Sequence, residues 1–119
     1  MQDLFSMAGK VVIITGGSGY LGSAITEGFL AQGAQVIVAD LAHTAERLSA
    51  GIEQSGDRLR FVACDLAKTD SIRAMLQESA AIWGRIDVLV NCATYGALNP
   101  IEKMTDEEWN RGLDGAVGT

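Results

Sequence analysis

The stretch KVVIITGGSGYLGSAITEGFLAQG, from Lys10 to Gly33, decides the fold of this chain. It begins with the apolar run Val11–Ile14, whose β-branched residues are typical of a strand buried on both faces. The residues that follow, Thr15–Gly19, tolerate the backbone angles of a tight turn. Apolar residues then recur at helical spacing and predict a helix that ends near Gly33. The predicted inward stripe of this helix comprises Leu21, Ala24, Ile25, Gly28 and Phe29.

Three glycines of this turn, Gly17, Gly19 and Gly22, have the spacing G-x-G-x-x-G. In dinucleotide-binding turns the first glycine permits the tight turn, the second lets the backbone approach a pyrophosphate, and the third lets helix and strand pack closely. The N-terminus of the following helix directs free N–H groups and a positive dipole end at the phosphates. An acidic residue, Asp40, closes the next apolar run, as this fingerprint requires. The pattern predicts a nucleotide-binding turn, and the alternative is a plain strand–helix connection.

The composition is that of one folded domain. The chain has 119 residues, of which 48% are hydrophobic and only one is proline, and this argues against disorder. Fifteen acidic residues against nine basic residues give a net charge of −6 without a basic cluster. Nucleic acid and anionic membranes are therefore disfavoured as partners. No apolar stretch approaches the roughly 20 residues of a membrane-spanning helix.

The cysteines and the N-terminus predict a cytoplasmic location. The opening MQDLFSMAGK has neither the charged nor the apolar region of a secretory signal. Cys64 and Cys92 each end an apolar run, and they lack the spacing of metal ligands. We expect free buried thiols in a reducing compartment, with a redox or metal role as the alternative.

The sequence repeats a rhythm of apolar runs and helical patterns. The runs VVIITGG, QVIVADL, RFVACDL and IDVLVNCA follow one another at roughly 25-residue intervals, about one βα unit each. Alternation of this kind predicts an α/β fold, a Rossmann-type doubly wound parallel sheet with helices on both faces. With a reversal after the third strand, the strand order is 3-2-1-4, and a crevice opens above strands 1 and 4.

Three further helices have predicted N-terminal caps. Thr44 is expected to cap a helix with Leu48 inward, and Thr69 a helix that ends at Gly84. The inward residues expected for this second helix are Ile72, Met75, Leu76, Ala80 and Trp83. Thr105-Asp106-Glu107-Glu108 has the pattern of a capping box at the start of the last helix.

Asp40 is the residue from which we predict the cofactor. At the end of the second strand a carboxylate accepts both ribose hydroxyls of an adenosine and repels a 2′-phosphate. No Arg or Lys follows until Arg47, so NAD is favoured over NADP. The alternative is an acid that only complements a helix dipole.

Other polar residues are weaker candidates. Asp65 ends the third strand, where it either accepts a hydrogen bond from an adenine amino group or only satisfies loop N–H groups. Asn91 ends the fourth strand, where it either bridges strand and cofactor or caps a loop. His43 lies at a predicted helix start, far from the nicotinamide end. Tyr20 and Tyr95 lack a lysine four residues later, so neither is expected to be an activated phenol.

Together these motifs resemble the N-terminal, cofactor-binding half of the short-chain dehydrogenase/reductase family, over nearly all of the chain. The turn at Thr15–Gly22 resembles the family's cofactor turn in the spacing of its extended branch, and Asp40 matches its NAD-selecting acid. Cys64–Leu66 resembles the adenine-side aspartate motif, and Trp83–Asn91 resembles the stretch leading into the N-N-A-G signature. The resemblance implies NAD-dependent oxidation of a secondary alcohol or reduction of a ketone. The opening Leu4–Lys10 and the turn G-Y-L-G are similar to members acting on sugar acids, which extends this to sugar acids or polyols.

The chain departs from the family's pattern in three places. The signature reads Asn91–Thr94, N-C-A-T, so a threonine replaces its glycine. Counted back from Gly118-Thr119, the place of the family's active-site Asn holds Gly115. The family's catalytic Ser and Tyr-x-x-x-Lys are missing from the sequence. We therefore expect residues 1–119 to be a truncated NAD(P)-binding domain, a fragment without catalytic residues of its own and inactive alone.

The expected binding residues lie at the glycine turn and at the ends of strands two to four. They are Gly16, Ser18, Gly19, Tyr20, Leu21, Gly22, Asp40, Leu41, Asp65, Leu66, Asn91 and Ala93. No metal ligand is predicted. The expected partner is the dinucleotide, with a small-molecule substrate only in a full-length parent. Because the apolar edge of strand Ile86–Val90 has no predicted neighbour, we also expect a homo-oligomer.

Two other functions remain open at this point. One is a nucleotide-binding or assembly module that never catalyses, for which NAD binding without turnover would be the evidence. The other is a methyltransferase-type domain, because S-adenosylmethionine also binds over a glycine-rich turn with an acid after the second strand. Thr15 and the glycine spacing from Gly16 to Gly22 argue against this second alternative.

Overall fold

A computed structural model describes residues 4–94 and 99–117 of the chain. Tyr95 and the Gly118-Thr119 pair lie outside these residues. In chain order the elements are β1 (Val11–Thr15), α1 (Tyr20–Ala31), β2 (Gln35–Asp40), the 3₁₀ segment η1 (Ala42–Leu48), α2 (Ser49–Ser55), η2 (Gly56–Arg58), β3 (Leu59–Ala63), α3 (Thr69–Trp83), β4 (Val88–Asn91), η3 (Ile101–Lys103) and α4 (Asp106–Val117).

The described part of the chain contains one sheet of four parallel strands in the order β3-β2-β1-β4, as the sequence predicts. In its register Ile13 of β1 lies opposite Ile37 of β2 and Leu89 of β4. The chain thus builds outward from β1 to β3 and then returns to the other side of β1. This reversal sets the carboxyl ends of β1 and β4 as the place where ligands bind in such sheets.

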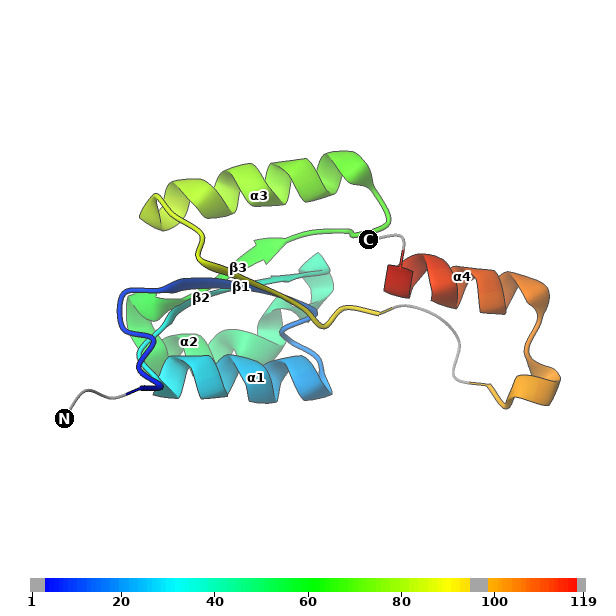
Figure 1. The fold of residues 1–119 in the computed structure, drawn as a ribbon, viewed down its shortest axis with the longest axis horizontal. Coiled ribbons are helices and arrows are strands. Elements are labelled where there is room, and N and C mark those ends of the chain that lie inside the picture. The colour runs from blue at the N-terminus through cyan, green and yellow to red at the C-terminus, as the bar shows by residue number, and fades with distance from the viewer. Residues whose placement is uncertain (1–3, 95–98, 118–119) are drawn as a thin grey trace.

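Helices cover both faces of the sheet (Figure 1). On the face of α1 and α2, the buried strand residues Val12 and Val36 pack with Leu30 and Leu48. On the face of α3, strand residues such as Ile13 pack with Met75 and Cys64. All of β1 is buried, as expected of its continuous apolar run. The helix α4 lies to the side of the sheet rather than over either face (Figure 1).

The inward face of α1 differs from the predicted stripe. Its buried residues are Gly22, Thr26 and Leu30. Of the predicted stripe, Leu21, Ala24 and Gly28 are exposed, whereas Ile25 and Phe29 are half-buried and pack against the core. The Thr26 hydroxyl donates to the Gly22 carbonyl at 2.8 Å, which satisfies this polar group in its buried position. The contact of α1 with the glycine turn decides which of its residues are buried, and the periodicity of apolar residues cannot predict that contact.

Two predicted caps, and part of one predicted helix face, are wrong. Thr44 is buried inside η1, where its hydroxyl donates to the Leu41 carbonyl at 2.7 Å. Thr69 is the first residue of α3, one place beyond the capping position, and makes no cap hydrogen bond. Thr69 lies one residue past the capping residue Lys68, and Thr44 lies three residues past the capping residue Leu41, so neither has the cap geometry. In α3 the predicted inward residues Leu76 and Ala80 are exposed.

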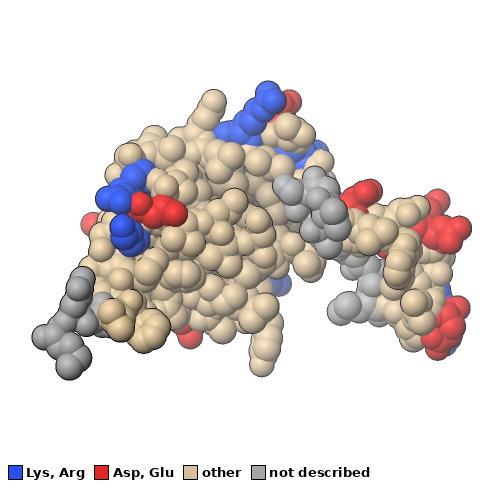
Figure 2. All heavy atoms as spheres, in the orientation of Figure 1, with Lys and Arg blue, Asp and Glu red and all other residues tan. Residues whose placement is uncertain are grey.

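The capping box of α4 is confirmed. The Glu108 N–H donates to the Thr105 hydroxyl and the Thr105 N–H donates to the Glu108 carboxylate, both at 3.1 Å. The side-chain amide of Asn99 also donates to Glu108, which ties the preceding segment to this helix start. Acidic side chains gather at the α4 end of the face shown in Figure 2. They complement the positive end of the α4 dipole.

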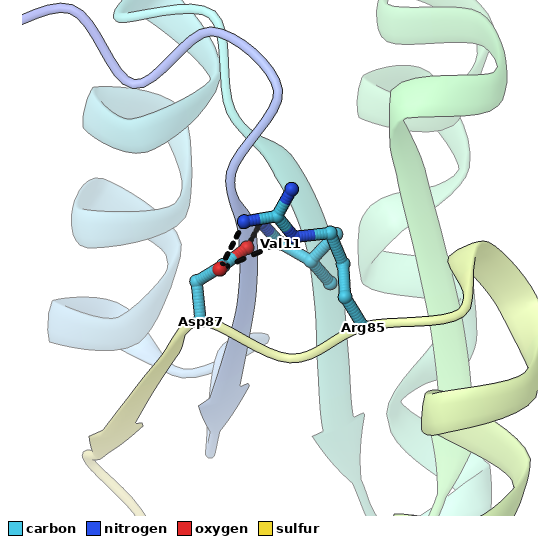
Figure 3. Close-up of polar contacts among 3 residues, drawn as sticks. All are labelled: Val11, Arg85 and Asp87. Atoms are coloured by element: carbon cyan, nitrogen blue, oxygen red, sulfur yellow. Dashed lines mark hydrogen bonds and ion pairs between the residues drawn. The ribbon is translucent and has the colours of Figure 1, made fainter.

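A polar clip joins the start of β4 to the start of β1 (Figure 3). Asp87 accepts the Val11 N–H at 2.8 Å through Oδ2, and its own N–H donates to the Val11 carbonyl at 2.9 Å. Arg85 donates from Nε and Nη2 to Asp87 Oδ1, at 3.2 and 2.6 Å. The hydrogen bond from Arg85, and after it that from Val11, holds the pKa of Asp87 below its ordinary value of 3.8.

Asp87→Asn is expected to lower the thermal midpoint at neutral pH, with an effect that disappears in acid. A carboxyl group with a depressed pKa stabilises the fold fully above its unfolded value of 3.8 and loses that contribution as the pH falls through the lower folded value. Melting curves of wild type and variant from pH 7 downwards measure this. The gap between their midpoints should narrow below pH 3.8.

The matched control for this clip is Asp57→Asn. The Asp57 side chain is 98% exposed and lies 3.9 Å from its ion-pair partner Arg60, so its charge contributes little. The thermal midpoint of Asp57→Asn should equal that of the wild type at every pH. An Asp87→Asn deficit that stayed constant from neutral to acid pH would contradict a role for the Asp87 charge.

Ser79 on α3 is expected to destabilise the protein. It is fully buried, and its hydroxyl has no hydrogen-bond partner among the described residues. Ser79→Ala should raise the free energy of unfolding by about 1 kcal/mol, because it removes an unsatisfied polar group and favours the helix. Chemical denaturation measures the change. The control Ser71→Ala, in the same helix, should lower the free energy of unfolding, because Ser71 Oγ accepts the Asp65 N–H at 2.8 Å.

Candidate functional site

The turn after β1 depends on Gly16 rather than on Gly17. Gly16 has φ +66°, and a Cβ there would lie 2.8 Å from the Cα of Ala93, which follows β4. Gly17 has no positive φ, but its Cβ would meet the Val38 side chain at 2.8 Å. The role predicted for Gly17, to permit the tight turn, therefore belongs to Gly16. The turn and the end of β4 are in close contact because Gly16 carries no side chain.

Gly22 brings α1 directly onto this turn. A Cβ at Gly22 would lie 2.1 Å from the Gly16 carbonyl oxygen and 2.8 Å from the Cα of Gly17. Gly19 stands one turn earlier, where its N–H donates to the same carbonyl at 3.1 Å. This is the close packing of helix and strand that the third glycine of a dinucleotide turn provides. It leaves the N-terminus of α1 exposed above the turn.

Asp40 at the end of β2 is held by three hydrogen-bond donors. Its Oδ1 accepts the Leu41 N–H at 2.8 Å. Its Oδ2 accepts the Ser18 N–H at 3.3 Å and also the Ser18 hydroxyl. We call these donors, the N–H and O–H of Ser18 and the N–H of Leu41, the anion cradle. The cradle links the glycine turn to the end of β2 and fixes the direction of the carboxylate.

Two hollows open beside Asp40 at the carboxyl ends of the strands. The first, the strand-end hollow of about 310 Å³, lies over β2 and β3 and is lined by Gly16, Ala39, Asp40, Leu41, Cys64, Asp65, Leu66, Ala67, Ala93, Thr94 and Arg111. The second, the glycine-turn hollow of about 440 Å³, lies over the N-terminus of α1 and is lined by Gly16, Gly19, Tyr20, Leu21, Gly22, Asp40, Arg47, Cys92, Ala93 and Thr94. Asp40 lines both hollows, together with Gly16, Ala93 and Thr94.

Asp65 already satisfies part of its own loop. Its Oδ1 accepts the Ala67 N–H at 3.0 Å, and its N–H donates to Ser71 Oγ. It also lines the strand-end hollow, so the loop contact leaves Oδ2 for a ligand. Beside it, burial raises the pKa of the Cys64 thiol, which keeps this sulfur protonated and unreactive. Cys64 is buried as predicted, whereas Cys92 is half-buried.

The remaining predicted residues are distributed around the site. Tyr20 and Leu21 line the glycine-turn hollow with exposed side chains. Asn91 lies opposite Thr15 in the sheet register, and its exposed side chain is outside both hollows. His43 is exposed on η1 and also lines neither hollow.

Two cations at the site were not among the predicted residues. Arg47 of η1 lines the glycine-turn hollow, and Arg111 of α4 lines the strand-end hollow. Thr94, at the position where the N-N-A-G pattern has glycine, lines both. The spacing of residues in the sequence does not predict that Arg47 and Arg111 line the hollows, because their positions depend on how η1 and α4 pack in the fold.

Residues 4–94 and 99–117 contain neither a membrane-spanning helix nor a cluster of metal ligands. No helix there combines the length and apolar composition that a membrane crossing needs. No group of three or more His, Cys, Asp or Glu side chains is arranged there to hold a metal ion.

Solved and curated proteins resemble this arrangement closely. A reductase of Mycobacterium tuberculosis, "(5R,7aS)-5-hydroxy-7a-methyl-1-oxo-2,3,5,6,7,7a-hexahydro-1H-indene-carboxyl-CoA reductase", is 42% identical over 89% of this chain and 42% of its own length. A D-threitol dehydrogenase of Mycolicibacterium smegmatis is 36% identical over 92% of this chain and 42% of its own length. The crystal structure of 3-ketoacyl-(acyl-carrier-protein) reductase from Brucella melitensis complexed with NADH matches 94% of this chain and 46% of that chain, with a TM-score of 0.79 and 29% identity.

The chain thus spans less than half the length of the relatives that it matches. A family model described as short chain dehydrogenase matches residues 10–116, from the start of β1 through most of α4. The order of the four described strands, the glycine turn and the acid after β2 agree with this match. The chain belongs to the short-chain dehydrogenase family.

Proposed function

We propose that this chain is the cofactor-binding part of an NAD-dependent oxidoreductase that interconverts a secondary alcohol and a ketone. The observation that supports NAD above all is Asp40, which lines both hollows and whose carboxylate is held in one direction by the anion cradle. In that position it accepts hydrogen bonds from both ribose hydroxyls of an adenosine and repels a 2′-phosphate.

The residues around Asp40 fit the other parts of the dinucleotide. The helix α1 begins without a side-chain cap, so its first N–H groups are available to the diphosphate. A side chain at Gly22 would push this helix end away from the turn. We place the adenine in the strand-end hollow, against Leu41, Asp65 and Leu66. When bound, the nicotinamide supplies the hydride acceptor of the reaction.

The substrate class that we propose is a secondary alcohol of the polyol or sugar-acid type. A D-threitol dehydrogenase among the relatives, at 36% identity, supports a polyol. The reaction belongs to the whole protein, because the relatives are more than twice as long as the matched region. We propose a cytoplasmic location from the two free thiols, Cys64 and Cys92.

Titration calorimetry with NAD, NADP and S-adenosylmethionine tests the proposal. NAD should bind most tightly, NADP more weakly because its 2′-phosphate meets Asp40, and S-adenosylmethionine should give no saturable heat. Binding of S-adenosylmethionine in preference to NAD would indicate a methyltransferase-type domain instead. Absence of binding to either dinucleotide would overturn the proposal.

A turnover assay of the 119-residue chain separates binding from catalysis. With NADH and a panel of ketones, we expect no turnover, because the sequence has no lysine placed to activate a tyrosine. NAD binding without turnover also fits a non-catalytic nucleotide-binding module. The same assay on a polypeptide that includes the family's Tyr-x-x-x-Lys segment distinguishes the two, since only the enzyme gains activity.

We also propose that the chain self-associates through the edge of β4. In the described residues β4 pairs only with β1, and Leu89 on this strand is 52% exposed. Leu89→Lys should shift the molecule towards monomer, because a charge on an edge strand opposes pairing with another copy. Analytical ultracentrifugation measures this against Leu4→Lys, the same substitution at a leucine that is 87% exposed beside α1 and outside the sheet. A wild-type monomer at high concentration would contradict this proposal.

A further inference from the structure

The helix α4 contributes one residue, Arg111, to the lining of the strand-end hollow. In the described part of the chain the other lining residues come from the glycine turn, from the end of β2 and from the segments that follow β2, β3 and β4. The start of α4 is fixed by the capping box, in which Thr105 and Glu108 exchange hydrogen bonds. Arg111 follows Glu108 by three residues, so it extends from a helix whose first turn is fixed.

The Arg111 guanidinium forms no ion pair with a carboxylate among the described residues. Two carboxylates line the same hollow, but Asp40 is held by the anion cradle and Asp65 accepts the N–H of its own loop at Ala67. Glu108, on the same helix, is engaged by the capping box and by Asn99. The exposed guanidinium therefore has its planar face available to a ligand in the hollow.

The other walls of the strand-end hollow suit a flat aromatic base. Leu41 and Leu66 supply apolar surface, together with Ala39, Ala67 and Ala93. The volume of about 310 Å³ is that of a small-ligand pocket. A base that lies against an apolar wall leaves its second face to be covered from another side. Arginine is suited to this, because its planar guanidinium stacks on aromatic rings and its charge is attracted by their π-electrons.

We propose that Arg111 binds the adenine of the dinucleotide by stacking its guanidinium on the base in the strand-end hollow. The inference rests on the proposed binding of NAD at this site. The base lies between the apolar wall at Leu41 and Leu66 and the guanidinium of Arg111, while its amino group donates to Asp65 Oδ2. The helix α4 thereby takes part in binding the adenosine end of the cofactor, a role that the glycine spacing and the acid after β2 do not imply.

Titration calorimetry with NAD tests this role of Arg111. Arg111→Gln should lower NAD affinity about tenfold, because the base loses its stacking partner. Arg111→Lys should lower it nearly as much, since an ammonium keeps the charge but has no plane to stack. Arg73→Gln is the matched control, because Arg73 is an exposed arginine of α3 that lines neither hollow. It should bind NAD as the wild type does.

Two fragments of the cofactor show which part of it Arg111 binds. Adenosine has the base without a phosphate, and its affinity, measured by NMR titration, should fall in Arg111→Gln by the same factor as that of NAD. Nicotinamide mononucleotide has a phosphate without adenine, and its affinity should equal that for the wild type. A general disturbance of the site by the substitution would instead weaken both fragments, and this result would overturn the inference.

The outcomes separate this inference from the proposed function. If Arg111→Gln and Arg73→Gln both bind NAD as the wild type does, the inference is wrong and the proposed function stands. The inference is also wrong if Arg111→Lys keeps wild-type affinity, or if Arg111→Gln loses affinity for NAD and not for adenosine, since both results assign Arg111 to the diphosphate. A wild type that binds no dinucleotide removes both proposals.

Folding of the variants is checked by circular dichroism and melting curves. Because the Arg111 side chain is exposed, both variants should melt with the wild type. If Arg111→Gln does not fold, Arg111→Lys gives the same comparison with NAD and with the two fragments. Wild-type affinity of Arg111→Lys for adenosine would then overturn the inference.

Discussion

Gly22→Ala is expected to abolish nucleotide binding and to destabilise the protein severely. The new methyl group would lie 2.1 Å from the Gly16 carbonyl oxygen and 2.8 Å from the Gly17 Cα. Both are backbone atoms of a turn that is fixed to the end of β4, so no side chain can move aside. The helix α1 must shift away from the turn, at a cost of about 3 kcal/mol or more. That shift displaces the N–H groups proposed to bind the diphosphate.

The matched control is Gly28→Ala, the same substitution in the same helix. A Cβ at Gly28 meets nothing within 4 Å. Alanine there should raise the free energy of unfolding by about 1 kcal/mol, because it is the better helix former. Urea denaturation gives the stabilities and titration with NAD gives the binding. If both variants behaved alike, the close approach at Gly22 would not be what the site requires.

Asp40→Ala should have the second-largest effect, on the affinity for NAD. The variant loses the acceptor for the ribose hydroxyls and leaves the Ser18 donors without their carboxylate. A hydrogen bond to a charged group contributes about 1.5–3 kcal/mol, so NAD affinity should fall about 10-fold to 100-fold. Titration calorimetry on the folded variant measures it.

Asp57→Ala is the control for this loss. Asp57 is an exposed carboxylate on η2 that lines neither hollow. Its removal changes the net charge by the same amount as Asp40→Ala, and it should leave NAD affinity as in the wild type. NAD affinity that survived Asp40→Ala would mean that the ribose is held elsewhere, and the assignment of NAD would lose its support.

The sheet could be predicted from the sequence because each strand is a continuous apolar run. Residues such as Val11–Ile14 and Val36–Ala39 are buried in the sheet, and an uninterrupted run of apolar residues predicts such burial directly. The order of the strands was predicted from a reversal of the chain's direction after the third strand, which is typical of doubly wound sheets. Stops at Gly33 and Gly84 were also predictable, because both adopt the positive φ that other residues avoid.

The details of the turn and of the helix starts could not be predicted in this way. Gly16 and Gly17 are neighbours of the same type, and only the contact of Gly16 with Ala93 shows which one the turn needs. Thr44 and Thr69 have the chemistry of caps, yet each lies inside its helix, past the capping residue. Residues that can cap are common near helix starts, so they predict the start of a helix only to within a few residues.

The surroundings of Asp40 were the least predictable part of the site. Ser18 and Asp40 are far apart in the sequence, and their hydrogen bonds depend on the path of the turn over β2. Arg47 was visible as the first basic residue after Asp40, but its distance along the chain concealed its place in the glycine-turn hollow. Distance along a chain is informative within one element and loses meaning once a 3₁₀ segment bends back.

The polar clip at Asp87 and the two hollows lie at opposite ends of β1. Directed evolution of cofactor preference would therefore change residues at the carboxyl end of β1, while the Asp87 contacts hold its amino end in place. Substitutions at Ser18, Asp40 and Arg47 leave the Val11 contacts intact, so libraries at these positions should contain a high share of folded members. For the same reason, a variant at Asp87 that is less stable than the wild type should keep the geometry of the two hollows at the other end of β1.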